Sequence, residues 1–400
     1  MRMSKPQVLF FSPYMGIWLH AMPEAFVAAS LRDAGADILY VVCDGLFSAG
    51  CTTMSAHNLS GESDPLKRER VCKQCRKSRD LIVTELGVST VTIDSLVDHA
   101  SLIEIESTVA TVSPDNVEAF QIDGFPLGRY ALHETIIHYK LTALDEITPS
   151  ALADLRLKLT HVLMTFRAGE RLLKDYKPDR MVTYNTHIST NYALMKLAES
   201  KNVPVFGLHA GGNMSDRLGS LYVFRRDMVV LYQDWIKRFE EEWKRMPASA
   251  PGMKNATQHF LAVASGRTAW AYSAPKSKQH FDLRDFFGIN SNQKVLLATL
   301  SSYDELFSSQ TMGVMDASPL LFTNQVEWIH NLINYARTRP ELFLVIRVHP
   351  RELPNLRDSV HSKHAKMLAA ELTDIPDNVR VNWPSDNISL YDLAPQVCRP

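Results

Sequence analysis

The chain has 400 residues, of which 46% are hydrophobic and 22% are charged, and its formal net charge is −1. This length suggests two or three domains, and the composition is that of a globular protein. The near-zero charge gives no electrostatic reason to expect nucleic acid as a partner. The sequence shows no signal-peptide pattern and no apolar run of about 18 residues that could span a bilayer. We therefore expect a cytoplasmic protein, and peripheral binding to the inner face of the cytoplasmic membrane stays open.

Strand-like and helix-like segments alternate along the first half of the chain. The expected strands are 7–12, 37–43, 180–184 and 203–208, and the expected helices are 22–34, 152–175 and 189–200. Such alternation predicts βαβ units with a parallel sheet.

A second α/β block follows a partly helical connector. Its expected strands are 294–300, 341–348 and 378–382, and its expected helices are 325–338 and 356–372, with another beginning at 390. The simplest account is two Rossmann-like, doubly wound domains at 1–231 and 293–400, joined by a helical hinge at 232–292. Because such a domain usually has five or six strands, we expect the second domain to be truncated.

Polar loops follow the expected strands of the first domain. Ligands bind just outside the carboxyl ends of parallel strands, so these loops are candidate binding residues. The acceptor-side candidates are Tyr14, Gly16, Asn185, Gly211 and Gly212. His209 is a candidate acid/base group or a simple turn residue. His20 and Glu24 lie four residues apart on the first expected helix, where they form either a catalytic pair or a solvated contact.

The densest polar cluster follows the strand at 341–348. Arg347, His349, Arg351 and Glu352 lie within six residues, and Pro350 ends the strand because it has no N–H to donate. We interpret this tip as a ligand site, and the alternative is a solvated turn with a charged rim.

A serine pair follows the strand at 294–300. Ser301 and Ser302, with Glu305 close behind, either bind a phosphate or cap a helix. His361 and His364 have helical spacing and lie beside lysines, which predicts a solvated face.

Four of the five cysteines lie in one segment, at Cys43, Cys51, Cys72 and Cys75. Cytosolic thiols stay reduced, so we expect metal ligands or plain thiols rather than disulfides. The CxxC of Cys72 and Cys75 suits a tetrahedral zinc, which would pin the expected loop at 44–70. The alternative is a buried Cys43 with the other thiols free. A redox role is least expected, because a thioredoxin-like CxxC opens a helix directly after a first strand.

No HExxH motif, nucleophile elbow or P-loop is present, which disfavours metalloprotease, hydrolase and NTPase functions. Several segments, taken together, resemble the capsule polysaccharide biosynthesis family, bacterial glycosyltransferases of the two-Rossmann (GT-B) type related to capsule Kdo transferases. The resemblance rests on Cys43-Asp44-Gly45 with the downstream CxxC and on the segments 207–213, 301–305, 324–328, 346–350 and 389–393.

The resemblance implies transfer of a sugar from a CMP-, UDP- or GDP-linked donor to a glycan or lipid-linked acceptor, with no cofactor required for catalysis. An "HP" pair contacts the donor in similar enzymes, which carries over to His349 and Pro350. Arg347 beside them would stabilise the leaving phosphate without a metal, assisted by the Ser301–Ser302 loop. The acceptor would enter past the loops at 14–20 and 209–213, where His209, His20 or Glu24 would take the hydroxyl proton.

Similar proteins continue past Tyr391 with a strand, a small-residue loop and a helix that complete the donor pocket. Because the donor pocket is expected to be incomplete, two other functions stay open. One is a non-catalytic truncated module that binds partners in a capsule assembly complex. The other is a sugar-nucleotide epimerase of the same architecture.

Overall fold

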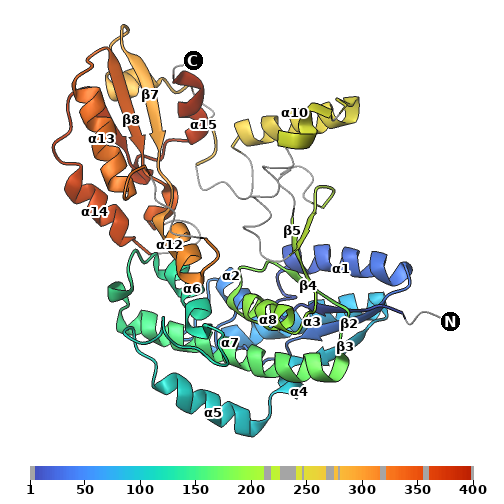
Figure 1. The fold of residues 1–400 in the computed structure, drawn as a ribbon. Coiled ribbons are helices and arrows are strands. Elements are labelled where there is room, and N and C mark those ends of the chain that lie inside the picture. Colours follow the sequence, from blue (N-terminus) through green and yellow to red (C-terminus); the bar gives the residue numbers. More distant parts are fainter. Residues whose placement is uncertain are drawn as a thin grey trace.

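A computed structural model describes residues 5–210, 218–225, 240–245, 247–266, 274–277, 280–315, 321–354 and 360–397. Within these ranges the chain forms two α/β units, each built on its own sheet (Figure 1). The expectation of two doubly wound α/β domains is confirmed at this level. The expected loop residues Gly211 and Gly212 lie outside the described residues.

The first unit has a six-stranded sheet in the order β3-β2-β1-β4-β5-β6. Its strands are β1 (Gln7–Phe11), β2 (Asp37–Val42), β3 (Ser89–Thr92), β4 (Arg180–Tyr184), β5 (Val205–His209) and β6 (Tyr222–Arg225). All neighbouring strands pair in parallel except β5 with β6, which pair antiparallel. The order reverses between β1 and β4, and this switch point is where open α/β sheets bind ligands.

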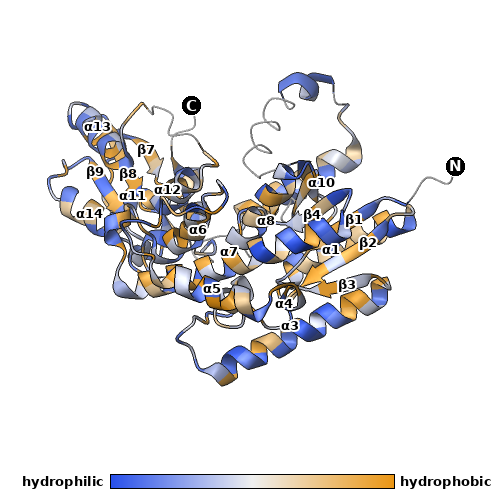
Figure 2. Ribbon diagram, turned by 60° about the horizontal axis from the view of Figure 1, so that its bottom comes forward, coloured by the Kyte–Doolittle hydropathy of each residue, from blue (hydrophilic) through white to orange (hydrophobic). Residues whose placement is uncertain are grey.

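Helices cover both faces of this sheet (Figure 1). The helices are α1 (Trp18–Asp33), α2 (Thr52–Ala56), α3 (Pro65–Leu86), α4 (Ile93–Leu96), α5 (His99–Ala110), α6 (Leu127–Tyr139), α7 (Pro149–Tyr176) and α8 (Ser189–Ser200). Val8 and Phe10 pack with α1 and α3, whereas Leu9 and Phe11 pack with α7 and α8. Because both faces are buried, the strands read as continuous apolar runs, and they are among the most apolar segments in Figure 2.

The second unit has three parallel strands in the order β7-β8-β9, at Lys294–Thr299, Leu342–Arg347 and Val379–Asn382. Helices α13 (Gln325–Arg337) and α14 (Lys363–Glu371) cover one face, and α11 (Leu283–Phe287) and α15 (Leu390–Leu393) cover the other. The core of this unit includes Leu283 and Ile289, which precede the boundary expected at residue 293. The connector carries α10 (Ala250–Ala264).

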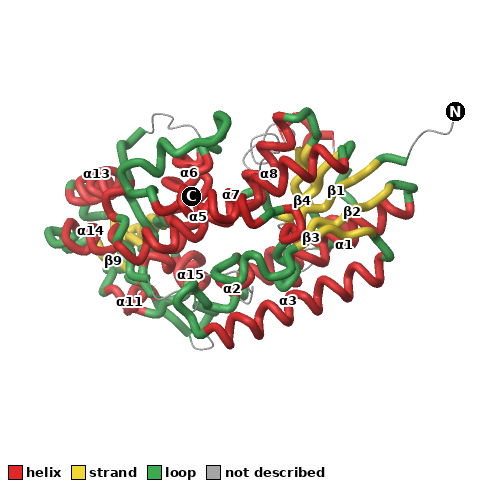
Figure 3. Tube along the Cα trace, turned by 90° about the horizontal axis from the view of Figure 1, so that it is seen from below, coloured by secondary structure: helices red, strands yellow, loops and turns green. Residues whose placement is uncertain are grey.

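The two units meet where α6 packs against α12 (Tyr303–Met312), the helix that follows β7. Arg129 Nε donates to Thr311 O at 2.6 Å, and Lys140 Nζ donates to Val360 O at 2.6 Å. Seen from below in Figure 3, α6 and α7 lie between the two sheets. The carboxyl end of β7 therefore faces the first unit across a helix pair.

Three local expectations were wrong. The expected loop at 44–70 contains α2 and the start of α3, so Cys72 and Cys75 lie on a helix. The helix expected from Leu356 begins at Lys363 within the described residues. His364 is not solvated, since it is 4% exposed, contacts Gln325 Oε1 at 3.0 Å and stacks on Tyr303.

Candidate functional site

Three aromatic rings stack at the carboxyl ends of β4 and β5. The ring of Tyr184 lies 4.4 Å from that of His20 and 5.9 Å from that of His209, centroid to centroid, with 20° between planes in each pair. The Tyr184 hydroxyl accepts a hydrogen bond from the Ala210 backbone N–H at 2.9 Å. His209 Nδ1 lies 2.7 Å from Ala210 O, which can only accept, so Nδ1 carries the proton and Nε2 is the basic nitrogen.

Glu24 lies beneath this stack, with a 2% exposed side chain. Its carboxyl accepts a hydrogen bond from the Ser12 hydroxyl and another from the Tyr184 backbone N–H at 2.6 Å. Burial raises the pKa of Glu24 to about 8, against the lowering effect of these two hydrogen bonds. Glu24 therefore joins the ends of β1 and β4 from inside the protein. The solvated alternative for the His20–Glu24 pair does not describe Glu24, whose carboxyl is buried.

A cavity of about 260 Å³ opens beside the β4 end. Its lining is rich in titratable side chains from α6, α7 and the loop after β4: His133, Glu134, His138, Lys158, Asn185 and His187. Asn185 adopts a left-handed conformation, with φ of 64°, and its Oδ1 accepts from the His187 N–H at 2.8 Å. This Asx turn fixes the backbone that presents His187 to the cavity.

The charges around the cavity are set by burial and by Glu134. Burial raises the pKa of Glu134, but Lys158, hydrogen bonds from Ser189 and His133 together bring it below its usual value. Burial lowers the pKa of His133, which is hydrogen-bonded to the backbone of Ser308 in the second unit. The cavity thus holds the Glu134 carboxylate, which interacts with Lys158, and the buried imidazole of His133, next to the contact between the two units.

On the second unit, His349 follows β8. Its Nδ1 accepts from the Arg351 backbone N–H at 3.2 Å, so in the neutral ring Nε2 carries the proton. Burial, with Arg351 next, lowers the pKa of His349 to about 4. His349 is therefore a neutral hydrogen-bond donor rather than a cation, and Pro350 begins a 3₁₀ turn (Pro350–Glu352).

The other polar groups of the tip bond mainly within the second unit, and Arg351 also donates to Ile137 O of α6 at 3.4 Å. Arg347 is 5% exposed and donates to Asn382 Oδ1. Arg351 pairs with buried Asp304 at 2.6 Å and also with Glu305. Ser302 donates its hydroxyl to Asp304, whereas Ser301 is exposed. The dense charges of the tip are thus mostly an internal network, and the solvated-turn alternative does not describe them either.

The remaining expected residues lie at the switch point. The Tyr14 hydroxyl is buried and lies 2.6 Å from the Thr190 hydroxyl. Gly16 lies against Cys75, and all four cysteines line one small cavity as free thiols. Burial raises the pKa of each thiol, that of Cys43 to about 12 and that of Cys72 to about 11, so no reactive thiolate is expected at neutral pH.

The titratable cavity residues that sequence reasoning missed are His133, Glu134, His138 and Lys158. They lie on α6 and α7, outside any strand-end loop. A larger hollow of about 670 Å³ lies around Lys177 and Lys201, at the amino ends of β4 and β5. The strand-end rule favours the smaller cavity. No described helix has the length and apolarity needed to cross a membrane.

No protein-family model matches the chain, and no curated protein matches its sequence. Among solved structures, the calicheamicin glycosyltransferase CalG4 is 14% identical over 95% of this chain and 71% of that chain, with a TM-score of 0.23. The glycosyltransferase SnogD from Streptomyces nogalater is 13% identical over 95% and 72%, with a TM-score of 0.23. Tyrosyl-tRNA synthetase from Archaeoglobus fulgidus is 11% identical over 56% and 62%, with a TM-score of 0.31. Likenesses this distant carry no functional argument, and the fold rests on the strand order and registers above.

Proposed function

We propose that the chain transfers a sugar from a nucleotide-activated donor to a hydroxyl of a glycan or lipid-linked acceptor. One observation carries this proposal. The cavity at the β4 end is lined by Ile137 of α6, and Arg351, two residues after His349, donates to the Ile137 carbonyl at 3.4 Å, so the cavity of the first unit and the His349 turn of the second adjoin at the contact between the units. A transfer reaction needs two substrates held close together, and sites on two adjoining units can hold one substrate each.

On the donor side, His349 is the group we assign to the nucleotide phosphate. The Nε2–H of His349 can donate to a phosphate oxygen. Arg351, Arg347 and Lys140 lie near the His349 ring. A sugar that leaves as a nucleotide phosphate develops negative charge, which these donors and cations stabilise. The sequence resemblance assigned the phosphate to Arg347 as well. We do not assign direct phosphate binding to Arg347, because its side chain is bonded to Asn382.

On the acceptor side, the cavity of about 260 Å³ is smaller than the usual drug-sized pocket and suits a single sugar unit. We assign His187 as the base. It takes the proton from the acceptor hydroxyl, the oxygen bonds to the anomeric carbon, and the bond from that carbon to the phosphate oxygen breaks. The electron pair leaves with the nucleotide. Following the sequence resemblance, we propose surface polysaccharide synthesis as the process.

The test is nucleotide release from CMP-N-acetylneuraminate, UDP-glucose and GDP-mannose, measured by chromatography with a mixture of oligosaccharide acceptors. We expect release from one donor, and His187→Ala should lower the rate about 10²- to 10⁴-fold while nucleotide binding is unchanged. His209→Ala tests the earlier base assignment in the same assay. His330→Ala, at a half-exposed histidine paired with Glu371, is the matched control.

Acceptor-dependent release with unaltered rate in His187→Ala would contradict the base assignment. Epimerised sugar without nucleotide release would replace the proposal with an epimerase. Absence of any release, together with absence of nucleotide binding, would favour the non-catalytic module.

A further inference from the structure

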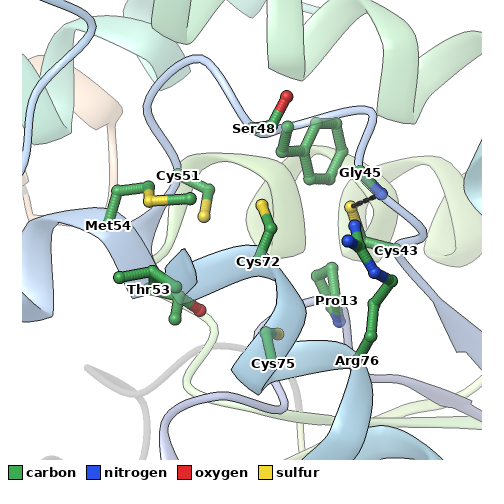
Figure 4. A pocket seen from close by; sticks show the side chains of 12 residues that line it. Pro13, Cys43, Gly45, Ser48, Cys51, Thr53, Met54, Cys72, Cys75 and Arg76 are labelled. Carbon is green, nitrogen blue, oxygen red and sulfur yellow. Dashed lines mark hydrogen bonds between the residues drawn. The ribbon is translucent and has the colours of Figure 1, made fainter. Parts of the chain in front are cut away.

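Four cysteines from three separate segments line one small cavity (Figure 4). Cys43 follows β2, Cys51 precedes α2, and Cys72 and Cys75 lie three residues apart on α3. The cavity volume is about 20 Å³, which is room for about one water-sized sphere. In Figure 4 the sulfurs of Cys51 and Cys72 point toward the same space.

We propose that these four thiols bind one structural Zn²⁺ ion. Four thiolates around a tetrahedral zinc are a common structural site, and a CxxC pair is a typical half of it. As the side chains stand, no three His, Cys, Asp or Glu residues in the described ranges are arranged to hold a metal. Binding therefore requires the thiols to rotate toward a common centre, and each coordinating thiol releases its proton to solvent.

Backbone N–H groups already surround the sulfurs. The Gly16 N–H donates to Cys75 Sγ at 3.1 Å, and the Gly45 N–H donates to Cys43 Sγ at 3.3 Å. A Cβ at Gly16 would lie 2.7 Å from Thr53 Cγ2 and 3.1 Å from Cys75 Cβ, so the close approach requires glycine. Hydrogen bonds of this kind orient ligands and stabilise the charge of bound thiolates.

Three cations lie close to the cluster. Lys158 interacts electrostatically with Cys51, Arg76 with Cys72, and Arg79 with Cys75. A zinc ion with four thiolates has a net charge of −2, which would be costly in a buried cavity without compensating cations. Arg76 is itself paired with Glu69, and Arg79 is paired with Asp44 and Asp80, so the charge of a zinc centre would be offset chiefly by Lys158 and the two N–H donors.

Helix α3 gives the proposed zinc a structural role. It has 22 residues, yet only Cys72 and Ile82 are buried. Because most helix stability in proteins comes from packing, so little burial holds a long helix weakly. A zinc shared with Cys43 and Cys51 would fasten α3 and α2 to the carboxyl end of the sheet. With all four positions filled by protein, the ion has no open site for catalysis.

The first experiment is elemental analysis of the untagged full chain, purified in reducing buffer without added chelator. We expect about one zinc per chain, and we expect Cys72→Ser and Cys75→Ser to retain less than about a tenth of it. Cys398→Ser, which changes the fifth cysteine, is the control and should keep the full zinc content.

Cobalt exchange supplies a readout that does not depend on the variants folding. Exchange of the wild-type metal for Co²⁺ should give intense thiolate-to-cobalt charge transfer and the visible bands of a tetrahedral sulfur site. Metal-free folded protein whose four thiols react readily with a thiol reagent would overturn the proposal. So would iron in place of zinc, an octahedral cobalt spectrum, or full zinc content in folded Cys72→Ser.

Discussion

The polar groups at the strand ends of the two α/β units are organised in opposite ways. In the first unit, groups scattered over the sequence converge at the switch point, where the Glu24 carboxyl accepts from the Ser12 hydroxyl and the Tyr184 backbone N–H. In the second unit, neighbouring residues of one dense cluster separate into internal bonds, as Arg347 does with Asn382 and Arg351 does with Asp304. In this protein the sheet topology brings distant residues together at one site. A dense run of charged residues in the sequence can instead form a buried network of internal bonds.

The largest expected effect concerns Glu24. Its pKa is raised from 4.5 to about 8 in the folded chain, so the unfolded chain loses its proton first as pH rises. The folded state is therefore destabilised between about pH 4.5 and 8, by on the order of 4–5 kcal/mol once both states have ionised. Glu24→Gln should abolish this loss, so the variant gains stability over wild type above pH 8 and matches it near pH 4.

Urea unfolding of both proteins across this pH range, followed by circular dichroism, measures the difference. A wild-type-minus-variant difference that does not change with pH would show that Glu24 keeps an ordinary pKa.

The next effect concerns Arg351. Its guanidinium is the partner of Asp304, which is 2% exposed, so Arg351→Met leaves a carboxyl buried without its cation. We expect a loss of about 3–5 kcal/mol in the free energy of unfolding, partly restored by adding Asp304→Leu. Arg337→Met is the control, because its partner Asp374 is 93% exposed. Equal urea midpoints for the two arginine variants would mean that the Arg351 network is not buried.

The smallest of these effects concerns Tyr184. Tyr184→Phe keeps the ring between His20 and His209 but removes the hydroxyl that accepts the Ala210 N–H. Ala210 is 4% exposed, so an unsatisfied N–H there should cost about 1–3 kcal/mol. Thermal unfolding measures the change, and Tyr139→Phe, whose hydroxyl bonds an exposed serine, should change less. An unchanged midpoint in Tyr184→Phe would indicate that this N–H reaches water.

Regular periodicity made the central elements predictable. Apolar runs and an amphipathic pattern predicted β4 and α7 nearly to their ends, and the βαβ alternation predicted the parallel sheets. Helix α3 was missed because it has no apolar stripe, although Asp64 as N-cap, Pro65 and Gly87 at the end were readable signals. Strand β3 was missed because it is four residues long and partly exposed.

The candidate site was predictable only in part. The loop at Asn185 was readable from its polarity after an apolar strand, and the helical spacing of His20 and Glu24 placed both on the side of the helix that contacts Tyr184. Sequence could not show that the Glu24 carboxyl bonds Tyr184, 160 residues away. Nor could it show that Lys158, on α7, lies beside the loop after β4. Such contacts depend on packing between elements far apart in the sequence, which local patterns do not encode.

The central claim is that a nucleotide binds at the His349 turn, on the second unit, next to the cavity at the β4 end of the first unit. Calorimetric titration of the full chain with CMP, UDP, GDP and CDP tests it directly. We expect one nucleotide to bind, His349→Ala to weaken its affinity about tenfold, and His349→Gln, which keeps an N–H donor, to restore most of it. His330→Ala should bind like wild type. Binding that is equally strong in His349→Ala, or absent for every nucleotide, would contradict the account.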